Sequence, residues 1–153
     1  MSLVTEEKRA DASEIYIGKE ICQEKSKQFL KEMGLPTGLL PLEDMEECGI
    51  VKDTGFIWLK QKQKTMHKFD KIGKTAHYAA EITAYVEPKK LKQVTGIKTK
   101  ELFIWITVTD VNVDVPSTGK LTFKTPTGMS RVFPVSAFEV TEPDDEEVKG
   151  NKE

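Results

Sequence analysis

The chain has 153 residues, of which 38% are hydrophobic and 31% charged, and its formal net charge at neutral pH is −2. This length suits a single globular domain, which we place at residues 1–141. No apolar run reaches the roughly 20 residues of a membrane-spanning helix. Residues 1–9 lack the apolar core of a secretory signal, so we expect a cytoplasmic or membrane-peripheral location. A secreted chain that has lost its signal would show the same pattern.

Charge is distributed unevenly along the chain. Residues 60–100 contain 11 lysines and three acidic residues, a balance of +8. Residues 1–59 and residues 139–153 each have a balance of −5. Such asymmetry informs about partners and solubility rather than about the fold.

The first predicted element is an amphipathic helix over residues 11–33. Its apolar residues recur at spacings of three, four or seven, as on one face of a helix: Ala12, Ile15, Cys22, Phe29 and Met33. Residues 34–41 follow, with two glycines, two prolines and three leucines. Glycine and proline end the helix, and the leucines make the segment too apolar for a free linker. We therefore predict a buried hinge.

From residue 54 to residue 138 the hydrophobic period becomes two, which predicts about six or seven antiparallel strands. In residues 102–115 the apolar parity changes after Val108, which predicts a β-bulge near Thr109–Asp110. Strands in this number seldom leave their edges open. We therefore predict a mostly β protein (α+β by count). In it the helix packs on a closed or nearly closed antiparallel barrel or sandwich, and residues 142–153 form a disordered acidic tail.

The sequence contains no motif that names a reaction. GxGxxG, GxxxxGK[ST] and GxSxG are absent, so we assign no catalytic residue and leave enzymatic activity open. Cys22 and Cys48 stand far apart without zinc-ligand spacing, so we expect no metal and no cofactor. We predict two reduced, partly buried thiols, and a Cys22–Cys48 disulfide is the alternative.

Two other functions stay open as alternatives. A lipid or ester hydrolase would have to assemble its site from scattered residues, with His67, His77 and Ser136 as the candidates. If residues 71–73 form a three-residue hairpin loop, His67 lies opposite His77, although two histidines do not complete a metal shell. A protein-interaction adaptor would use the helix or the acidic tail.

The lysines between residues 60 and 100 support our main hypothesis, a non-enzymatic module that binds anionic lipid, such as a phosphoinositide headgroup, or an apolar ligand. The predicted ligand-binding residues are Lys60, Lys62, Lys64, Lys68, Lys89, Lys90, Lys98 and Lys100. Solvated strand faces also carry lysine merely to guard against aggregation. We expect no nucleic-acid partner, because arginine is scarce and basic residues do not alternate with aromatic ones.

Four segments, taken in order, resemble the plant domain-of-unknown-function family 538. They are Gly34-Leu35-Pro36-x-Gly38-Leu39-Leu40-Pro41, Gly55-x-x-Trp58-Leu59, Gly96-Ile97-Lys98-x-Lys100-Glu101-Leu102 and Phe133-Pro134-Val135-Ser136-Ala137-Phe138. Residues 3–7 and 58–62 resemble its cytosolic branch, which is related to a trichome-size regulator. The resemblance covers roughly residues 3–139.

This resemblance implies a plant origin, a compact helix-plus-antiparallel-barrel domain and a role in trichome development or stress response. The family has been likened to lipid-binding bactericidal/permeability-increasing proteins, and hydrolytic activity has also been proposed for it. It supplies no agreed catalytic residues to carry over to this chain.

Overall fold

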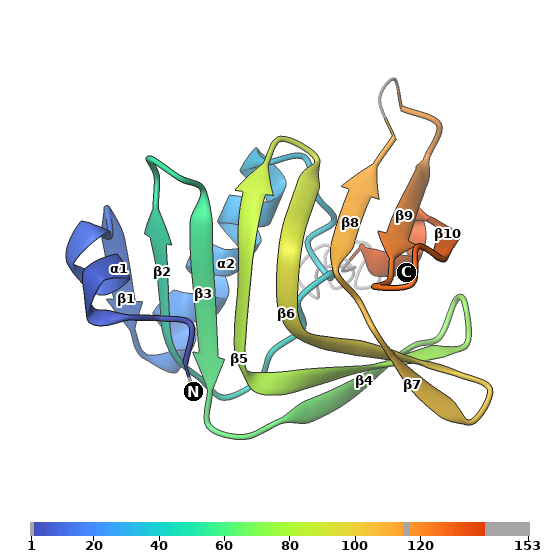
Figure 1. Cartoon of the computed structure of the whole chain (residues 1–153), viewed down its shortest axis with the longest axis horizontal. Helices are drawn as coiled ribbons and strands as arrows, with labels where there is room; N and C mark the ends of the chain where they lie inside the picture. Colours follow the sequence, from blue (N-terminus) through green and yellow to red (C-terminus); the bar gives the residue numbers. More distant parts are fainter. Residues whose placement is uncertain (1, 115–116, 140–153) are drawn as a thin grey trace, which may run out of the picture.

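The computed structural model describes residues 2–114 and 117–139 (Figure 1). These residues form two α-helices, ten β-strands and one 3₁₀ turn. In chain order they are α1 (Glu6–Asp11), β1 (Glu14–Ile17), α2 (Lys19–Glu32), β2 (Met45–Val51), β3 (Phe56–Gln61), β4 (Thr65–Phe69), β5 (Lys74–Glu87), β6 (Lys90–Glu101), β7 (Ile104–Thr107), β8 (Asp110–Val113), β9 (Lys120–Lys124), β10 (Ser130–Pro134) and η1 (Val135–Phe138). The tail predicted to be disordered, 142–153, lies outside the described residues.

All ten strands belong to one antiparallel sheet, which is not closed. Its order is β1-β2-β3-β5-β6-β8-β9-β10, with β4 added to β5 and β7 added to β6. In the described part of the chain the end strands β1 and β10 do not pair with each other. The predicted closed or nearly closed barrel or sandwich of six to seven strands is therefore wrong.

The sheet stays open because its two long central strands, β5 and β6, bend near their middle. On one side of the bend β5 pairs with β3 and β6 with β8, and on the other side β5 pairs with β4 and β6 with β7. Tyr78 pairs with Ile97, whereas Thr83 pairs with Thr95, so β5 advances five residues while β6 advances two. Gly96 makes the bend possible: it adopts φ +88°, and a Cβ at this position would overlap the carbonyl oxygen of Glu81. The sheet turns a corner here instead of continuing around a barrel.

The buried side chain of Gln61 donates hydrogen bonds to backbone carbonyl groups at this corner. Its amide nitrogen Nε2 donates to the carbonyl oxygens of Tyr78 at 3.2 Å and Ala79 at 3.1 Å. Gln61 is only 2% exposed, so its amide supplies these carbonyl groups with a donor where water has little access.

Beyond the corner, four strands form a projection that we call the arm. It consists of β4, residues 74–78 of β5, residues 97–101 of β6, and β7, and it extends at the lower right of Figure 1. On one face of the arm the side chains of Phe69, Ala76, Tyr78 and Ile97 are buried. The opposite face is turned away from the core.

The segment predicted as one helix over residues 11–33 is divided: Asp11 ends helix α1, and two further elements follow. Glu14–Ile17 is strand β1, paired with β2, and helix α2 begins after Gly18, whose φ is +119°. Alternating isoleucines at 15 and 17 suit a strand as well as a helical stripe. Helix α2 packs against β2 and β1 (Figure 1).

The buried hinge predicted at residues 34–41 is confirmed. Gly34 has a left-handed φ of +74° after α2, and Leu35 and Leu39 are each 4% exposed. The hydroxyl of Tyr78 donates to the carbonyl oxygen of Leu39 at 2.9 Å. The leucines of the hinge belong to the same hydrophobic core as Cys22 and Leu30 of α2. Cys22 and Cys48 are both buried and free, as predicted.

Candidate functional site

The candidate site is the solvent-facing side of the arm, where two rows of side chains run across four strands. Residues that pair directly in an antiparallel sheet share a face. The pairing therefore places Lys68, Thr75, Lys100 and Trp105 in one row, and Met66, His77, Lys98 and Thr107 in the next. Lys64 precedes β4 with the same parity as Met66. We call these nine residues the outer face.

Four of the predicted ligand-binding lysines meet on this face: Lys64, Lys68, Lys98 and Lys100. All four are exposed. Among residues 2–114 and 117–139, none of their ammonium groups lies within salt-bridge distance of a carboxylate. The outer face therefore presents four positive charges that no described acidic side chain neutralises.

The other four predicted lysines lie elsewhere. Lys60 is on β3, half-buried, with its Nζ 4.0 Å from a carboxylate oxygen of Glu81. Lys62 is exposed in the turn before β4. Lys89 and Lys90 lie at the β5–β6 turn, at the far end of these strands from the arm (Figure 1). The backbone of Lys89 bonds to Met33 and Val113, which indicates a structural role.

An aromatic contact occupies the middle of the outer face. The rings of His77 and Trp105 meet edge to face with centroids 5.9 Å apart, and the Nδ1 atom of His77 is buried without a hydrogen-bond partner among the described residues. Burial, and then the charges of Lys64 and Lys98, hold the pKa of His77 below its ordinary value. The imidazole is therefore neutral at neutral pH, and the positive charge of this face comes from lysine.

Next to the outer face lies a turn that sequence reasoning missed. Leu102 and Phe103 connect β6 to β7, because Glu101 pairs with Ile104. We call Leu102–Trp105 the β6–β7 tip. The sequence prediction assigned these residues to one continuous strand over 102–115, which in fact is divided into β7 and β8. The signal available in the sequence was the period-two pattern of strand residues both before and after Leu102-Phe103, which is typical of a hairpin.

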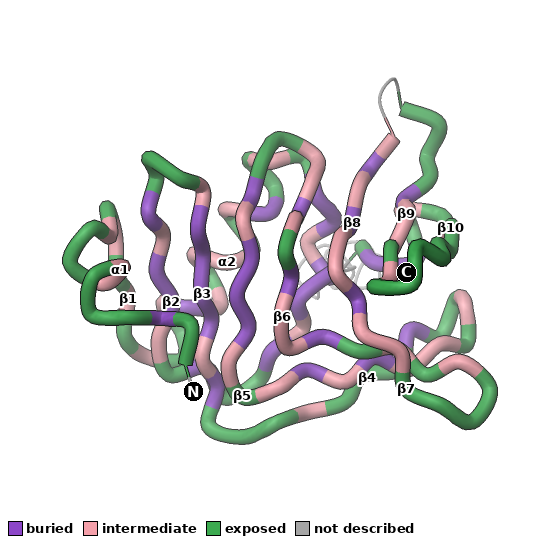
Figure 2. Tube along the Cα trace, in the orientation of Figure 1, coloured by how far each residue is buried: buried purple, intermediate pink, exposed green. Residues whose placement is uncertain are grey.

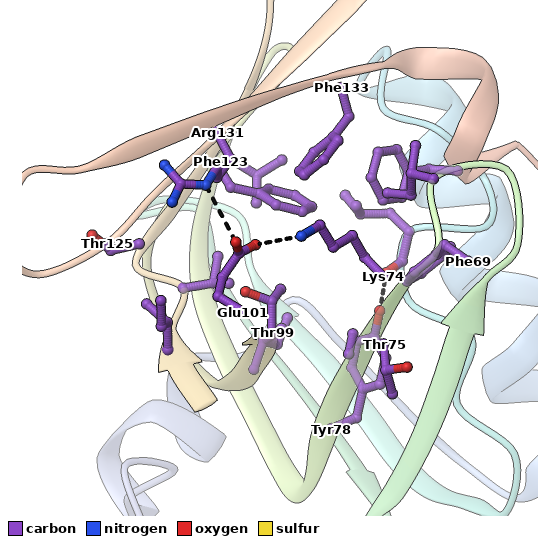
Figure 3. Close-up of a pocket in the computed structure, with 18 of the residues that line it drawn as sticks. Phe69, Lys74, Thr75, Tyr78, Thr99, Glu101, Phe123, Thr125, Arg131 and Phe133 are labelled. Atoms are coloured by element: carbon purple, nitrogen blue, oxygen red, sulfur yellow. Dashed lines mark hydrogen bonds and ion pairs between the residues drawn. The ribbon is translucent and has the colours of Figure 1, made fainter. Parts of the chain in front are cut away.

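On the inner side of the arm, Glu101 forms an ionic cluster at the mouth of a small apolar cavity (Figure 3). Its carboxylate lies 3.2 Å from Lys74 Nζ and 3.5 Å from Arg131 Nε. The cavity measures about 30 Å³ and is lined by Phe69, Tyr78, Phe123 and Phe133 among others. This volume suits a water molecule rather than a lipid chain.

The hydrolase candidates do not come together. The β4–β5 loop holds four residues, so Met66 rather than His67 pairs with His77. The two histidines consequently point to opposite faces of the arm. Ser136 lies in η1, and no hydrogen bond links it to either histidine in the part of the chain that the structure describes.

The model of a family described as "Protein of unknown function, DUF538" matches residues 26–139. The chain belongs to this family. The family predicted from the sequence resemblance is thereby confirmed, and its description names no activity. Neither the search of curated proteins nor the search of solved structures returns a match.

Most of the segments that resemble the DUF538 family support the fold. Leu35, Trp58 and Phe138 are buried in the core, and Gly55 has a left-handed φ of +82°. The segment 96–102 is different, because it also supplies Lys98 and Lys100 to the outer face and Leu102 to the tip.

Two further properties bear on the function of this family member. No helix within residues 2–114 and 117–139 has the length and apolar character to cross a membrane. Over the same residues, His, Cys, Asp and Glu side chains nowhere gather in threes that could hold a metal ion.

Proposed function

We propose that this DUF538 protein is a non-enzymatic module that binds the surface of anionic membranes through the outer face of the arm. Lys64, Lys68, Lys98 and Lys100 contact the lipid phosphates, and phosphoinositides or phosphatidylserine supply the negative charge. The observation that carries the proposal is the gathering of these four exposed, unneutralised lysines on adjacent rows of one sheet face.

The expected strength of this contact follows from charge. A basic residue close to an anionic surface contributes about 1 kcal/mol, so four lysines contribute about 4 kcal/mol, which corresponds to a dissociation constant of about 1 mM. Lysine is a flexible point charge without the planar fork of arginine. We therefore expect selectivity for total negative charge, with phosphoinositides preferred because each carries several phosphate charges.

The plant origin, the membrane-peripheral cytoplasmic location, the kinship with trichome-size regulators and the role in development or stress response belong to this proposal as well. The origin, the kinship and the role rest on the sequence resemblance alone, whereas the membrane-peripheral location follows from the proposed binding surface. The cavity at the arm gives the apolar-ligand alternative no support, because its volume of about 30 Å³ has no room for an acyl chain.

The test is co-sedimentation with vesicles of phosphatidylcholine, alone or mixed with phosphatidylserine or a phosphoinositide. The wild-type protein is expected to sediment with the anionic vesicles, and less so as salt rises. The variant Lys64→Glu/Lys68→Glu/Lys98→Glu should remain in the supernatant. The matched control is Lys27→Glu/Lys31→Glu/Lys120→Glu, which changes net charge equally at exposed positions outside the arm. Equal binding by both triple variants would refute the assignment of the face.

A further inference from the structure

The β6–β7 tip is exposed (Figure 2), and all four of its side chains are apolar or aromatic. Phe103 is 93% exposed, Leu102 87%, Ile104 62% and Trp105 41%. Four consecutive large apolar residues therefore stand in water at the end of a narrow hairpin. Contiguous apolar surface of this kind marks an interaction site, whereas single exposed apolar residues are ordinary.

The residues of this turn are not those that folding favours. The loop between β6 and β7 has two residues, and its first, Leu102, adopts a left-handed φ of +58°. Two-residue hairpin loops favour glycine or asparagine at such a position, because a Cβ there is strained. A bulky apolar side chain kept in a strained, solvent-exposed position points to a function for that side chain.

The charges around the tip identify the kind of surface it meets. Lys100 lies two residues before Leu102, about 7 Å along an extended strand, and Lys98 follows on the same face. Glu101 flanks the tip, but its carboxylate turns inward to Lys74 and Arg131. The hairpin thus has an apolar end, and its cations lie further back along β6. This arrangement matches a bilayer with anionic headgroups, whose acyl boundary lies about 5–10 Å deep.

We propose that the β6–β7 tip is a membrane anchor: Leu102 and Phe103 enter the acyl region of an anionic bilayer, while Trp105 and Lys100 lie at the headgroup level. This inference rests on the proposed function and adds to it an orientation, with the outer face toward the headgroups and the β6–β7 end of the arm tilted into the membrane. It also adds an apolar contribution that salt does not screen. Such a contribution is needed, because four lysines alone bind only weakly.

The first experiment compares vesicle binding by Leu102→Asn/Phe103→Ser with the wild-type protein. Asparagine tolerates a left-handed backbone, so the melting temperature should stay the same or rise. Binding to phosphatidylserine vesicles should weaken about tenfold or more, because two large apolar side chains no longer leave water. The matched control is Ile17→Asn/Leu3→Ser, two exposed apolar residues outside the arm, and it should bind like wild type. Equal binding by tip and control variants would overturn the anchor.

The second experiment measures depth directly. Phe103→Trp in a Trp105→Phe background places one exposed indole at the tip, while Trp58 stays fully buried. Vesicles with brominated acyl chains should quench the fluorescence at position 103. They should leave the control Ile17→Trp in the same background unquenched. Absence of quenching at 103 in vesicle-bound protein would place the tip outside the acyl region and overturn the inference.

The outcomes separate the two proposals. If the lysine triple variant loses binding while the tip variant binds normally, the anchor fails and the anionic-membrane function stands. If the protein binds neutral phosphatidylcholine vesicles through the tip and the lysine variant binds normally, the apolar anchor stands and the anionic-membrane function fails. Binding to no vesicle removes both. A dimer in sedimentation velocity that Leu102→Asn/Phe103→Ser dissociates would assign the tip to a second copy of this chain and overturn the anchor.

Discussion

Lys100 and Trp105 lie directly opposite each other on β6 and β7, and the ammonium nitrogen of Lys100 is 5.9 Å from the centroid of the indole ring. A cation and an amphipathic aromatic ring are thus held together at the base of an apolar turn. This is the combination found where proteins meet the interface between headgroups and acyl chains.

Trp105 should report membrane binding. On addition of phosphatidylserine vesicles, its fluorescence emission should move to shorter wavelength, because the ring leaves water. Trp105→Ala should weaken vesicle binding about threefold to tenfold through lost apolar contact. Trp58 is 0% exposed and should contribute a constant background. An unchanged emission spectrum in fully vesicle-bound protein would contradict the orientation.

Leu102→Gly should separate stability from binding. Glycine removes the strain of the left-handed φ at this position, worth about 1–2 kcal/mol, and costs about 0.5–1 kcal/mol through the greater freedom of the unfolded chain. The free energy of unfolding in urea should therefore rise by about 0.5–1 kcal/mol while vesicle binding falls. Thr107→Gly, on the extended strand β7, should instead lower stability. A loss of stability in Leu102→Gly would show that the leucine serves folding.

The pKa of His77 should lie below the ordinary value of a histidine side chain, because burial and the charges of Lys64 and Lys98 lower it. Lys64→Gln and Lys98→Gln should each raise this pKa, and Lys27→Gln should leave it unchanged. NMR titration of the ring protons measures the values. No upward shift in either variant would contradict the placement of these lysines on the outer face.

The same depressed pKa has a consequence for stability. The unfolded chain takes up a proton at residue 77 near pH 6.5, before the folded protein does. The contribution of neutral His77 is therefore fully present above that pH and is lost as pH falls through the folded pKa. His77→Gln should flatten this part of the urea-stability profile between pH 7 and pH 5.

Gln61→Ala should destabilise the protein because the buried carbonyl of Tyr78 and the half-buried carbonyl of Ala79 lose their side-chain donor. Each unsatisfied buried group costs about 1–3 kcal/mol, so we expect a loss of about 3 kcal/mol in the free energy of unfolding. Gln63→Ala, at an exposed position two residues away, is the control and should change stability little. Equal effects would mean that the corner of the sheet does not depend on Gln61.

The two thiols should be inert in the folded protein. Burial, followed by hydrogen bonding to Cys22, raises the pKa of Cys48 to about 12, and burial also raises the pKa of Cys22. A colorimetric thiol reagent should detect almost no reaction under native conditions and two thiols after denaturation. A disulfide found in the native protein would instead support the bridge considered from the sequence.

Sequence reasoning located what local chemistry dictates. Gly34 and its prolines marked the end of the helix, and the leucines of the hinge were correctly predicted to be buried. The parity change after Val108 marks a real irregularity, but it is a break between β7 and β8 rather than a bulge within one strand. The four clustered lysines were all among the predicted residues.

Pairing between residues far apart in the sequence could not be predicted from local sequence patterns. The bend in β5 and β6 depends on Gly96 meeting the Glu81 carbonyl across the sheet, and no spacing along the chain encodes that contact. One residue of loop length decided whether His67 or Met66 faces His77. Leu102 and Phe103 resembled the start of a strand, because an apolar pair has the same pattern whether buried or exposed.

The most direct test of the account is flotation with vesicles in which the phosphatidylserine fraction is raised stepwise at constant salt. Wild-type protein and the Lys27→Glu/Lys31→Glu/Lys120→Glu control should bind increasingly as the anionic fraction grows. Lys64→Glu/Lys68→Glu/Lys98→Glu should stay unbound throughout. If all three proteins float alike, or if none floats at any composition, the outer face of the arm is not a membrane-binding surface.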